Sequence, residues 1–352
     1  MKDFKVIGLM SGSSLDGVDI AYVNFSHDNR RWFFNIIEAG NIPYTSSWKE
    51  KLSSAFDKSP EELKKLDIEY GQYLGTITKK FINKYDLDPK LIASHGHTIF
   101  HRPEEHYTLQ IGDGDEIARA TGIVTINDFR SEDVKKGGQG APLVPIGDKH
   151  LFAEYPICLN IGGIANVSYD IEDRRIAYDI CMANQLLNYL ANKLGYDYDN
   201  NGNLARQGDV NEMLLNKLND NAYYTQEAPK SLGREFFERN QRYIIDSCEI
   251  DIKDVIATAT EYVAHQITAA TNHLEKSKIL ITGGGAKNNY LVERITSLSK
   301  HEIIIPDTMI IDYKEALIFA FLGALKLEDK TNVLSSVTGA SSDSSSGNIC
   351  LP

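Results

Sequence analysis

The chain reads FKVIGLMSGSSLDGVDIAYVNF over residues 4–25, and a shorter copy of the pattern, ICLNIGGIANVSY, occupies residues 157–169. In each copy an apolar run leads into a Gly-rich turn and a second apolar run follows, which predicts a β-hairpin. Backbone N–H groups in a Gly-rich turn bind anions well, because no side chain blocks the approach of the ligand. The repetition predicts two similar lobes that each present such a turn to a phosphate chain.

Strands and helices alternate along the rest of the chain, which is typical of an α/β fold. The spacing of apolar residues predicts helices over residues 46–84, 185–194, 210–218, 254–274, 315–325 and from 288 onward. Short apolar runs predict further strands over residues 91–94, 108–111, 122–126, 176–180, 278–282 and 303–306. The small residues of the last helix predict close packing, and the Ser-rich stretch 335–347 has the composition of a flexible tail.

The composition is that of a globular protein, with 352 residues of which 42% are hydrophobic and 24% charged. A chain of this length is expected to form two domains around sizeable cores. The formal net charge of −12 argues against a nucleic-acid partner, because a nucleic-acid-binding surface needs a basic patch. A negative substrate must therefore be attracted by a local cluster of donors.

The cysteines are scattered, without a C-x-x-C pair, which fits a reducing cytosol better than a zinc or disulfide framework. They are Cys158, Cys181, Cys248 and Cys350. The apolar run at residues 4–10 is too short for a signal peptide, and no stretch reaches the roughly 18 apolar residues of a membrane span. We expect a soluble, cytoplasmic protein without a membrane partner.

The turn of the first hairpin supplies N–H and hydroxyl donors for phosphate, and carboxylates that can hold Mg²⁺ through water. Its residues are Gly12, Ser13, Ser14, Leu15, Asp16, Gly17, Val18 and Asp19. The same residue types also suit an ordinary hairpin turn with Asx caps. The G-x-x-x-x-G-K-[ST] motif of a P-loop does not occur in the chain.

Three further segments allow a functional and a structural interpretation. Asp179 follows a strand and is either a general base or a helix N-cap. Gly162 and Gly163 form either a second phosphate cradle or a buried hairpin that needs positive φ. Gly283 and Gly284 stand between a strand and a helix, where they either contact a nucleotide or form a plain turn.

Several cations and histidines are also candidates. Arg130 lies in a Gly-rich loop and can form a fork with a carboxylate or phosphate, or a solvated salt bridge. Lys230 and Arg234 lie at a turn or helix start. His95 and His97 lack the partners of a zinc site, so we expect them to line a pocket or to be structural.

Nine segments, in order, resemble motifs of the anhydro-N-acetylmuramic acid kinase family and span nearly the whole chain. They are GLMSGSSLDGVD (8–19), SHGHT (94–98), LQIGD (109–113), NDFRSEDVKKGGQGAPLVP (127–145), LNIGGIANVS (159–168), PKSLGREFF (229–237), TGGGAKN (282–288), EALIFAFLG (315–323) and SVTGAS (336–341). One Gly-rich loop would be weak evidence, whereas nine ordered motifs are specific.

The resemblance implies a two-lobed actin/hexokinase-like ATPase fold, made of duplicated ribonuclease-H-like domains, with ATP in a central cleft. On this basis we expect an N-terminal lobe of residues 1–126 plus 335–352 and a C-terminal lobe of residues 127–334. The SVTGAS motif would then be ordered. The family also suggests a homodimer.

The resemblance further implies a kinase that uses ATP and Mg²⁺ on an amino sugar, 1,6-anhydro-N-acetylmuramic acid, recovered from peptidoglycan. By position, Asp179 matches the catalytic base, and the turn from Gly12 to Asp19 would contact ATP. The cations of the family's sugar site match Arg130, Lys230 and Arg234, together with Glu315.

One segment departs from the family pattern. After the catalytic Asp the family has T-G-P-G-N, whereas this chain has Ile180-Cys181-Met182-Ala183-Asn184. The change removes donors and backbone freedom beside the expected substrate. It leaves two alternatives open, a kinase of another anhydrosugar or amino sugar and a non-catalytic nucleotide-binding regulator.

Overall fold

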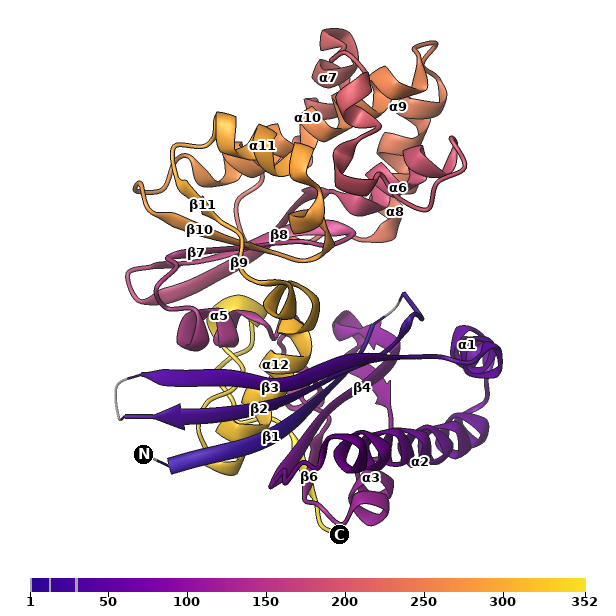
Figure 1. The fold of residues 1–352 in the computed structure, drawn as a ribbon, viewed down its shortest axis with the longest axis vertical. Helices are drawn as coiled ribbons and strands as arrows, with labels where there is room; N and C mark the ends of the chain where they lie inside the picture. Colours follow the sequence, from indigo (N-terminus) through magenta and orange to yellow (C-terminus); the bar gives the residue numbers. More distant parts are fainter. Residues whose placement is uncertain (1, 13, 29–30) are drawn as a thin grey trace. The chain divides into compact units, whose positions relative to one another are not determined.

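The computed structural model describes residues 2–12, 14–28 and 31–352, and the chain divides into two compact units (Figure 1). The first unit is made of Met1–Phe152 and Tyr313–Pro352, and the second of Ala153–Asp312. Each unit holds one β-sheet with helices, so the predicted α/β class is confirmed.

These units divide the chain at other places than the expected boundaries after residues 126 and 334. The segment 127–152 belongs to the first unit, because its loop is hydrogen-bonded to the C-terminal segment around Thr338. Most of the last long helix also belongs there, because it packs on the first sheet. Sequence pattern alone does not show either tertiary contact.

A seven-stranded sheet forms the centre of the first unit, in the order β12-β6-β4-β1-β2-β3, with β5 paired to β4. Its strands are β1 (Lys2–Ser11), β2 (Gly17–His27), β3 (Trp32–Pro43), β4 (Leu91–Arg102), β5 (Tyr107–Ile111), β6 (Thr125–Asn127) and β12 (Asn348–Cys350). Strands β1, β2 and β3 are antiparallel neighbours, whereas β4 runs parallel to β1 and β6 parallel to β4.

The first unit also contains the following α-helices, of which α12 begins in the second unit. They are α1 (Ser46–Ser53), α2 (Pro60–Tyr85), α3 (Gly114–Thr121), α4 (Ser131–Lys135), α5 (Pro145–Leu151), α12 (Thr308–Leu327) and α13 (Ser335–Thr338). The single helix predicted over 46–84 is two helices, because Ser59 forms a capping box with Glu62 and Pro60 occupies the first turn of α2. Helix α12 is kinked at Tyr313, where the units divide.

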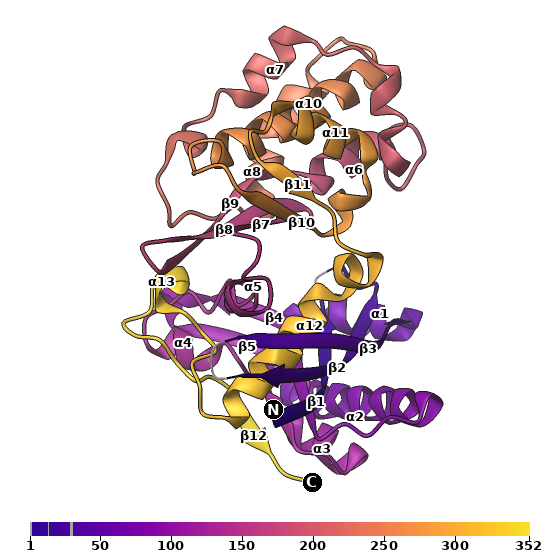
Figure 2. The same ribbon diagram turned by 60° about the vertical axis from the view of Figure 1, so that its left-hand side comes forward.

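Helices α2 and α12 pack on opposite faces of the first sheet (Figure 2). Ile7 and Leu9 of β1 belong to the apolar cluster that α2 completes, and Gly8 between them faces α12. A Cβ atom on Gly8 would collide with the Ala316 carbonyl oxygen. A Cβ on Gly323 would likewise crowd β4, so the predicted close packing of this helix is confirmed.

The sheet of the second unit repeats the topology of the first. Its order is β11-β10-β7-β8-β9, with strands β7 (Ile157–Ile161), β8 (Ile164–Ile171), β9 (Arg174–Met182), β10 (Lys278–Thr282) and β11 (Glu302–Ile304). Strands β7, β8 and β9 are antiparallel neighbours, and β10 and β11 continue the sheet in parallel. The order β9-β8-β7-β10-β11 therefore matches β3-β2-β1-β4-β6, as the repeated hairpin predicts.

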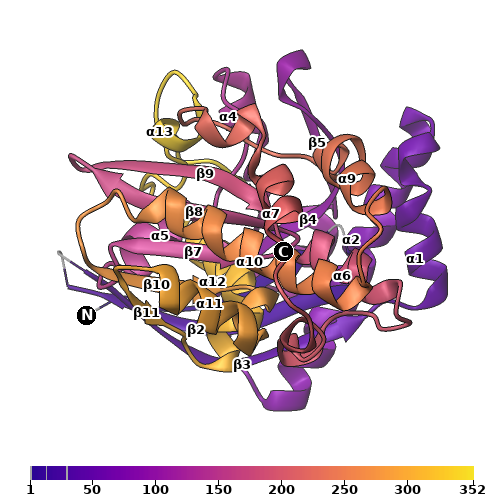
Figure 3. The ribbon, with the colours of Figure 1, turned by 90° about the horizontal axis from the view of Figure 1, so that it is seen from above.

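Helix α10 covers one face of this second sheet, as Figure 3 shows from above. The helices of the unit are α6 (Asn184–Asn192), α7 (Glu212–Asn219), α8 (Arg234–Phe236), α9 (Arg242–Asp246), α10 (Ile252–Thr271) and α11 (Asn289–Leu298). Leu159 of β7 and Val167 of β8 are cross-strand partners in the core beneath α10. Their chain neighbours Asn160 and Asn166 therefore point to the opposite face.

The Ser-rich stretch 335–347 is ordered, so the interpretation as a flexible tail is wrong. It begins with α13, and Ser344 and Ser346 are buried. Asn332 anchors the stretch, since its Nδ2 donates to Ser346 O at 2.8 Å and its Oδ1 accepts from Ser346 N–H at 2.7 Å. Composition misleads here because short polar side chains are satisfied by such local bonds.

Candidate active site

A row of polar side chains crosses the face of the second sheet that points away from α10. Asp179 on β9 pairs with Asn166 on β8, Asn166 with Asn160 on β7, and Asn160 with Thr282 on β10. Cross-strand partners lie on the same face of a sheet. The sequence pattern gives neither asparagine a role of its own, although Asn160 stands two residues before the Gly162–Gly163 turn and Asn166 three residues after it.

Two Gly-rich turns meet the start of α6 beside this row. The Asn184 N–H donates to Gly162 O at 3.0 Å, and its side-chain Nδ2 donates to Ile161 O at 3.1 Å. The same Nδ2 lies 3.4 Å from where a Cβ on Gly284 would be. Asn184 is the one residue of the family's T-G-P-G-N pattern that this chain keeps, and it is hydrogen-bonded to the first turn and lies beside the second.

The fold does not require glycine at positions 162 and 163. Both have ordinary negative φ, and a Cβ there would meet its nearest atoms only at 3.6 and 3.8 Å. Gly283 differs, with φ of 81° and a Cβ position only 2.7 Å from Asn160 Oδ1. The buried-hairpin explanation therefore fails for Gly162 and Gly163, and the room that they leave favours an anion cradle.

Asp179 is held by the loop that precedes α8. Its carboxylate Oδ2 accepts from the Leu232 N–H at 2.9 Å, and its own N–H donates to Lys230 O at 3.3 Å. Burial raises the pKa of the Asp179 carboxyl above its ordinary value, and the Leu232 hydrogen bond opposes this shift. A carboxylate with a raised pKa is a better proton acceptor, which suits a general base. The helix N-cap alternative fails, because Ala183 is the N-cap of α6.

The segment that departs from the family pattern is buried. Ile180, Cys181, Met182 and Ala183 are each at most 3% exposed and belong to the core of the second unit. Ile180 is the extra residue of a β-bulge, because Asp179 pairs with Asn166 whereas Cys181 pairs with Ala165. These side chains pack inward, into the core beneath α10.

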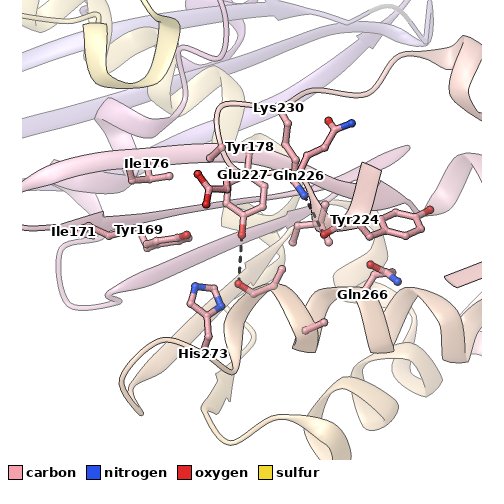
Figure 4. A pocket seen from close by; sticks show the side chains of 14 residues that line it. Tyr169, Ile171, Ile176, Tyr178, Tyr224, Gln226, Glu227, Lys230, Gln266 and His273 are labelled. Carbon is pink, nitrogen blue, oxygen red and sulfur yellow. Dashed lines mark hydrogen bonds between the residues drawn. The ribbon is translucent and has the colours of Figure 1, made fainter. Parts of the chain in front are cut away.

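The Lys230 ammonium points into a pocket on the α10 side of β9 (Figure 4). It donates to Tyr223 O at 3.1 Å and lies 4.8 Å from the Tyr223 ring centre and 5.4 Å from that of Tyr178. The pocket has a volume of about 560 Å³. Tyr178 precedes Asp179, so the two side chains point to opposite faces of the sheet. The structure therefore does not bring the Lys230 ammonium to the Asp179 carboxylate.

The turn of the first hairpin combines open and packed positions. Gly12 has room for a side chain, since a Cβ would meet only Ser14 Oγ at 3.7 Å, whereas a Cβ on Gly17 would collide with Ile42 O. Asp19 Oδ1 accepts from Asn41 Nδ2 at 2.7 Å. Ser13 and the side chain of Arg234 lie outside the described residues, so their assignments stay predictions.

A chain of buried polar groups lies under this turn. Ser11 Oγ is 2.8 Å from His97 Nδ1 and 2.6 Å from the Tyr44 hydroxyl, which is 2.5 Å from that of Tyr70. Burial lowers the pKa of His97 to about 4 and raises that of Tyr44 to about 12. His97 is therefore a neutral, structural histidine at pH 7.

Arg130 is fixed on two sides. Its Nε and one terminal nitrogen donate to His95 Nε2 at 3.0 and 2.9 Å, and its other terminal nitrogen donates to Gly140 O at 2.6 Å. Burial lowers the pKa of Arg130 to about 10, although Glu315 raises it, so the guanidinium stays charged at pH 7. Burial and Arg130 together hold the pKa of His95 well below its ordinary value, so this imidazole is neutral and accepts.

Glu315 follows the kink of α12. Its side chain is solvent-accessible, yet the surrounding protein desolvates the carboxylate and, with Asp19, raises its pKa, while Arg130 and Lys314 lower it. Asp19, Arg130 and Glu315 are thus close enough to interact electrostatically. The structure brings these three predicted residues together in the first unit.

Among residues 2–12, 14–28 and 31–352, no group of three or more His, Cys, Asp or Glu side chains is placed to hold a metal ion. In the same part of the chain, no helix has both the length and the apolar character needed to cross a membrane.

The repeated topology and the Gly-rich hairpin of each unit define the fold, a duplicated α/β fold of the actin/hexokinase-like type. A family model described as anhydro-N-acetylmuramic acid kinase matches residues 4–352. The chain belongs to this family and is a phosphotransferase that uses ATP.

Relatives support this assignment over the whole length of the chain. The anhydro-N-acetylmuramic acid kinase of Vibrio parahaemolyticus is 36% identical, over 95% of each chain. That of Pasteurella multocida is 36% identical over 97% of this chain and 96% of its own.

Among solved structures, the activator of 2-hydroxyisocaproyl-CoA dehydratase from Clostridium difficile, with bound ADPNP, has a TM-score of 0.46 at 16% identity and covers 91% of this chain and 94% of its own. A ROK hexokinase from Thermus thermophilus has a TM-score of 0.40 at 13% identity, covering 93% and 100%.

Proposed function

We propose that the protein opens 1,6-anhydro-N-acetylmuramic acid with water and phosphorylates the sugar at O6, as an enzyme of peptidoglycan recycling. In this reaction the C1–O6 bond breaks, a water oxygen joins C1, and O6 takes the γ-phosphoryl group of ATP. The products are N-acetylmuramic acid 6-phosphate and ADP. The observation that carries the proposal is the Asp179 carboxylate, whose raised pKa and place in the polar row suit a base.

Asp179 would accept a proton from the attacking water, as the base of an inverting glycosidase does. The hydrogen bond from the Leu232 N–H holds one carboxylate oxygen and orients the group. Asn166, the cross-strand partner of Asp179, offers an amide on the same face that can bind the water or a sugar hydroxyl.

The phosphates of ATP would bind at the open glycines. Gly12, Gly162 and Gly163 have free space where a Cβ would stand, and Gly284 is exposed next to Asn184. Backbone N–H donors stabilise the charge of a phosphoryl group during transfer. Ser14, Leu15, Asp16, Gly17 and Val18 shape the first turn, and Gly283 the last.

Asp19 is the residue that would hold Mg²⁺ through water. Its carboxylate is oriented by Asn41 and repels that of Glu315, so a cation would be favoured there. Mg²⁺ in kinases uses one or two carboxylates together with phosphates and waters, so the site needs no larger cluster. When bound, Mg²⁺ neutralises charge on the phosphate oxygens.

Arg130 and Glu315 would bind the sugar, with the guanidinium facing the lactyl carboxylate. Arg130 is well suited, because its contacts with His95 and Gly140 are to neutral acceptors and leave its charge uncompensated by them. We retain Arg234 as a sugar-binding candidate. Lys230 is a weaker candidate, because its ammonium lies on the other face of β9 from Asp179.

The side chains of residues 180–183 are buried in the core instead of facing a ligand, which favours this substrate over another anhydrosugar or amino sugar. The intact Asp179 environment likewise disfavours a non-catalytic regulator. We further propose a cytoplasmic homodimer, to be checked by light scattering of the purified protein.

The decisive experiment is an ADP-release assay with MgATP and the anhydrosugar, followed by mass spectrometry of the product. We expect ADP and a sugar heavier by one water and one phosphoryl group. If only a different sugar from a panel is turned over, that sugar is the substrate and the present assignment is wrong. ATP binding without turnover on any sugar would favour the regulator.

A further inference from the structure

The loop that carries Arg130 is bonded to a segment 205 residues later in the chain, beside α4 and α13 (Figure 2). Thr338 Oγ1 donates to Asp133 Oδ1 at 2.7 Å, and the Gln139 N–H donates to Thr338 O at 2.8 Å. The Ser341 N–H donates to Lys136 O at 3.1 Å. The segment that contains α13 is thus hydrogen-bonded to α4 and to the residues that follow α4.

Asp133 is the centre of this junction. It is fully buried, at 0% exposure, and its second carboxylate oxygen, Oδ2, accepts from the Gly140 N–H at 2.8 Å. Its backbone oxygen accepts from the Gly138 N–H at 2.9 Å, and a Cβ on Gly138 would collide with the carboxylate. One side chain therefore fixes Thr338 on one side and the far end of the loop on the other.

Gly140 passes this constraint to Arg130. Asp133 holds the N–H of Gly140, and the carbonyl oxygen of Gly140 accepts from the Arg130 guanidinium at 2.6 Å. The two groups belong to successive peptide planes that share the Gly140 Cα, so a shift of the N–H moves the Cα from which the carbonyl extends. The guanidinium position then depends on Asp133 as well as on His95.

The donors around Asp133 are neutral. Among the described side chains, no Lys or Arg lies within ion-pair distance of its carboxylate. A buried carboxylate held only by neutral donors is costly compared with an apolar residue. Its two oxygens can, however, join two donors from separate segments in fixed geometry, which an apolar side chain cannot do.

We propose that Thr338 and Asp133 are positioning residues that hold the Arg130 guanidinium for the sugar, so that the C-terminal segment controls sugar binding. This inference rests on the proposed function in one respect, the assignment of Arg130 to the sugar. Neither residue touches the substrate in this scheme.

The test compares Thr338→Val, which removes the hydroxyl at constant size, with Thr338→Ser, which keeps it. We expect the KM for the anhydrosugar to rise about tenfold in Thr338→Val, with kcat and the KM for MgATP within about twofold of wild type. Thr338→Ser should restore the sugar KM. Ser335→Ala is the matched control, because the Ser335 hydroxyl donates to Asp343 instead, at 2.7 Å.

A folded Thr338→Val protein with an unchanged sugar KM would overturn the proposal and leave Thr338 a structural role. Equal rises in both KM values would also overturn it, because the effect would then not be specific to Arg130. Thermal unfolding of each variant shows which proteins are folded.

A second readout needs no substrate. Modification of Arg130 by phenylglyoxal, followed by peptide mass spectrometry, should be several-fold faster in Thr338→Val than in wild type, Thr338→Ser or Ser335→Ala. An unchanged rate would refute the positioning role. If the wild type turns over no anhydrosugar, the proposed function fails, and this rate still decides whether Thr338 positions Arg130.

Discussion

Arg130 in the first unit and Asp179 in the second carry opposite charges, and they are held in opposite ways. The Arg130 guanidinium donates to His95 and Gly140, so its plane is fixed by side-chain bonds on two edges. Among the described residues, the Leu232 N–H is the donor to the Asp179 carboxylate, and burial raises the pKa of this carboxyl.

The difference corresponds to the two tasks. A group that binds a carboxylate gains from a fixed plane, because less conformational entropy is lost when the ligand arrives. A base must keep its affinity for a proton, and a neighbouring cation would reduce it. Among the described side chains, no cation lies within ion-pair distance of Asp179. We therefore expect substitutions at the two residues to affect different kinetic constants.

The largest effect should follow Asp179→Asn. Loss of a general base typically costs 10²–10⁴-fold, so we expect kcat to fall by about 10³-fold while ATP binding, measured by calorimetry, is nearly unchanged. Glu172→Gln, at the exposed tip of the same β8–β9 hairpin, is the matched control and should keep full activity. Near-normal turnover of Asp179→Asn would remove the base assignment.

Arg130→Met should act on binding instead. We expect the KM for the anhydrosugar to rise about 30- to 100-fold with a smaller loss of kcat, because a charge-assisted bond contributes roughly 1.5–3 kcal/mol. Arg130→Lys keeps the charge without the planar fork, so its KM should lie between the two. A loss confined to kcat in steady-state assays would show that Arg130 is not a binding group.

Much of the fold could be predicted from the sequence, because local apolar patterns determine it. The strand over 278–282 has the predicted ends, and the helix predicted over 254–274 spans Ile252–Thr271. The strand predicted over 91–94 extends to Arg102, because β4 continues through polar residues that pair with β5. Pairing of this kind depends on a partner elsewhere in the chain.

The site was predictable only in part, for a similar reason. Asp179 and the Gly turns can be recognised from the linear sequence. Asn160 and Asn166 can be recognised as part of the site only when the register of their strands is known. The contact between Asp133 and Thr338 spans 205 residues and has no local signature. The burial of the departure after Asp179 likewise depends on packing under α10, which no spacing shows.

The dependence of kcat/KM on pH should report the ionisation of Asp179, whereas Arg130 stays charged over the same range. Since the base must be ionised, kcat/KM should fall at acid pH, with a midpoint above the ordinary Asp value of about 3.9, because burial raises the Asp179 pKa. The pKa of His97, lowered to about 4, could produce a similar fall. His97→Gln separates the two, and we expect the acid limb to stay in place in that variant. If the acid limb shifts in His97→Gln, the limb belongs to the histidine and not to Asp179.

The smallest effects concern stability, where the two residues should differ in sign. A raised pKa means that burial of the ionised Asp179 carboxylate opposes folding at pH 7, so Asp179→Asn should unfold at the same temperature as wild type or slightly higher. This gain should vanish as the pH falls through the raised pKa, because wild-type Asp179 is then protonated. Arg130→Met leaves His95 Nε2 and Gly140 O without their donor and should cost about 1–3 kcal/mol. Calorimetric unfolding at several pH values measures both. A clear loss of stability in Asp179→Asn at pH 7 would mean that the carboxylate is a structural anchor like Arg130, and the contrast between the two residues would disappear.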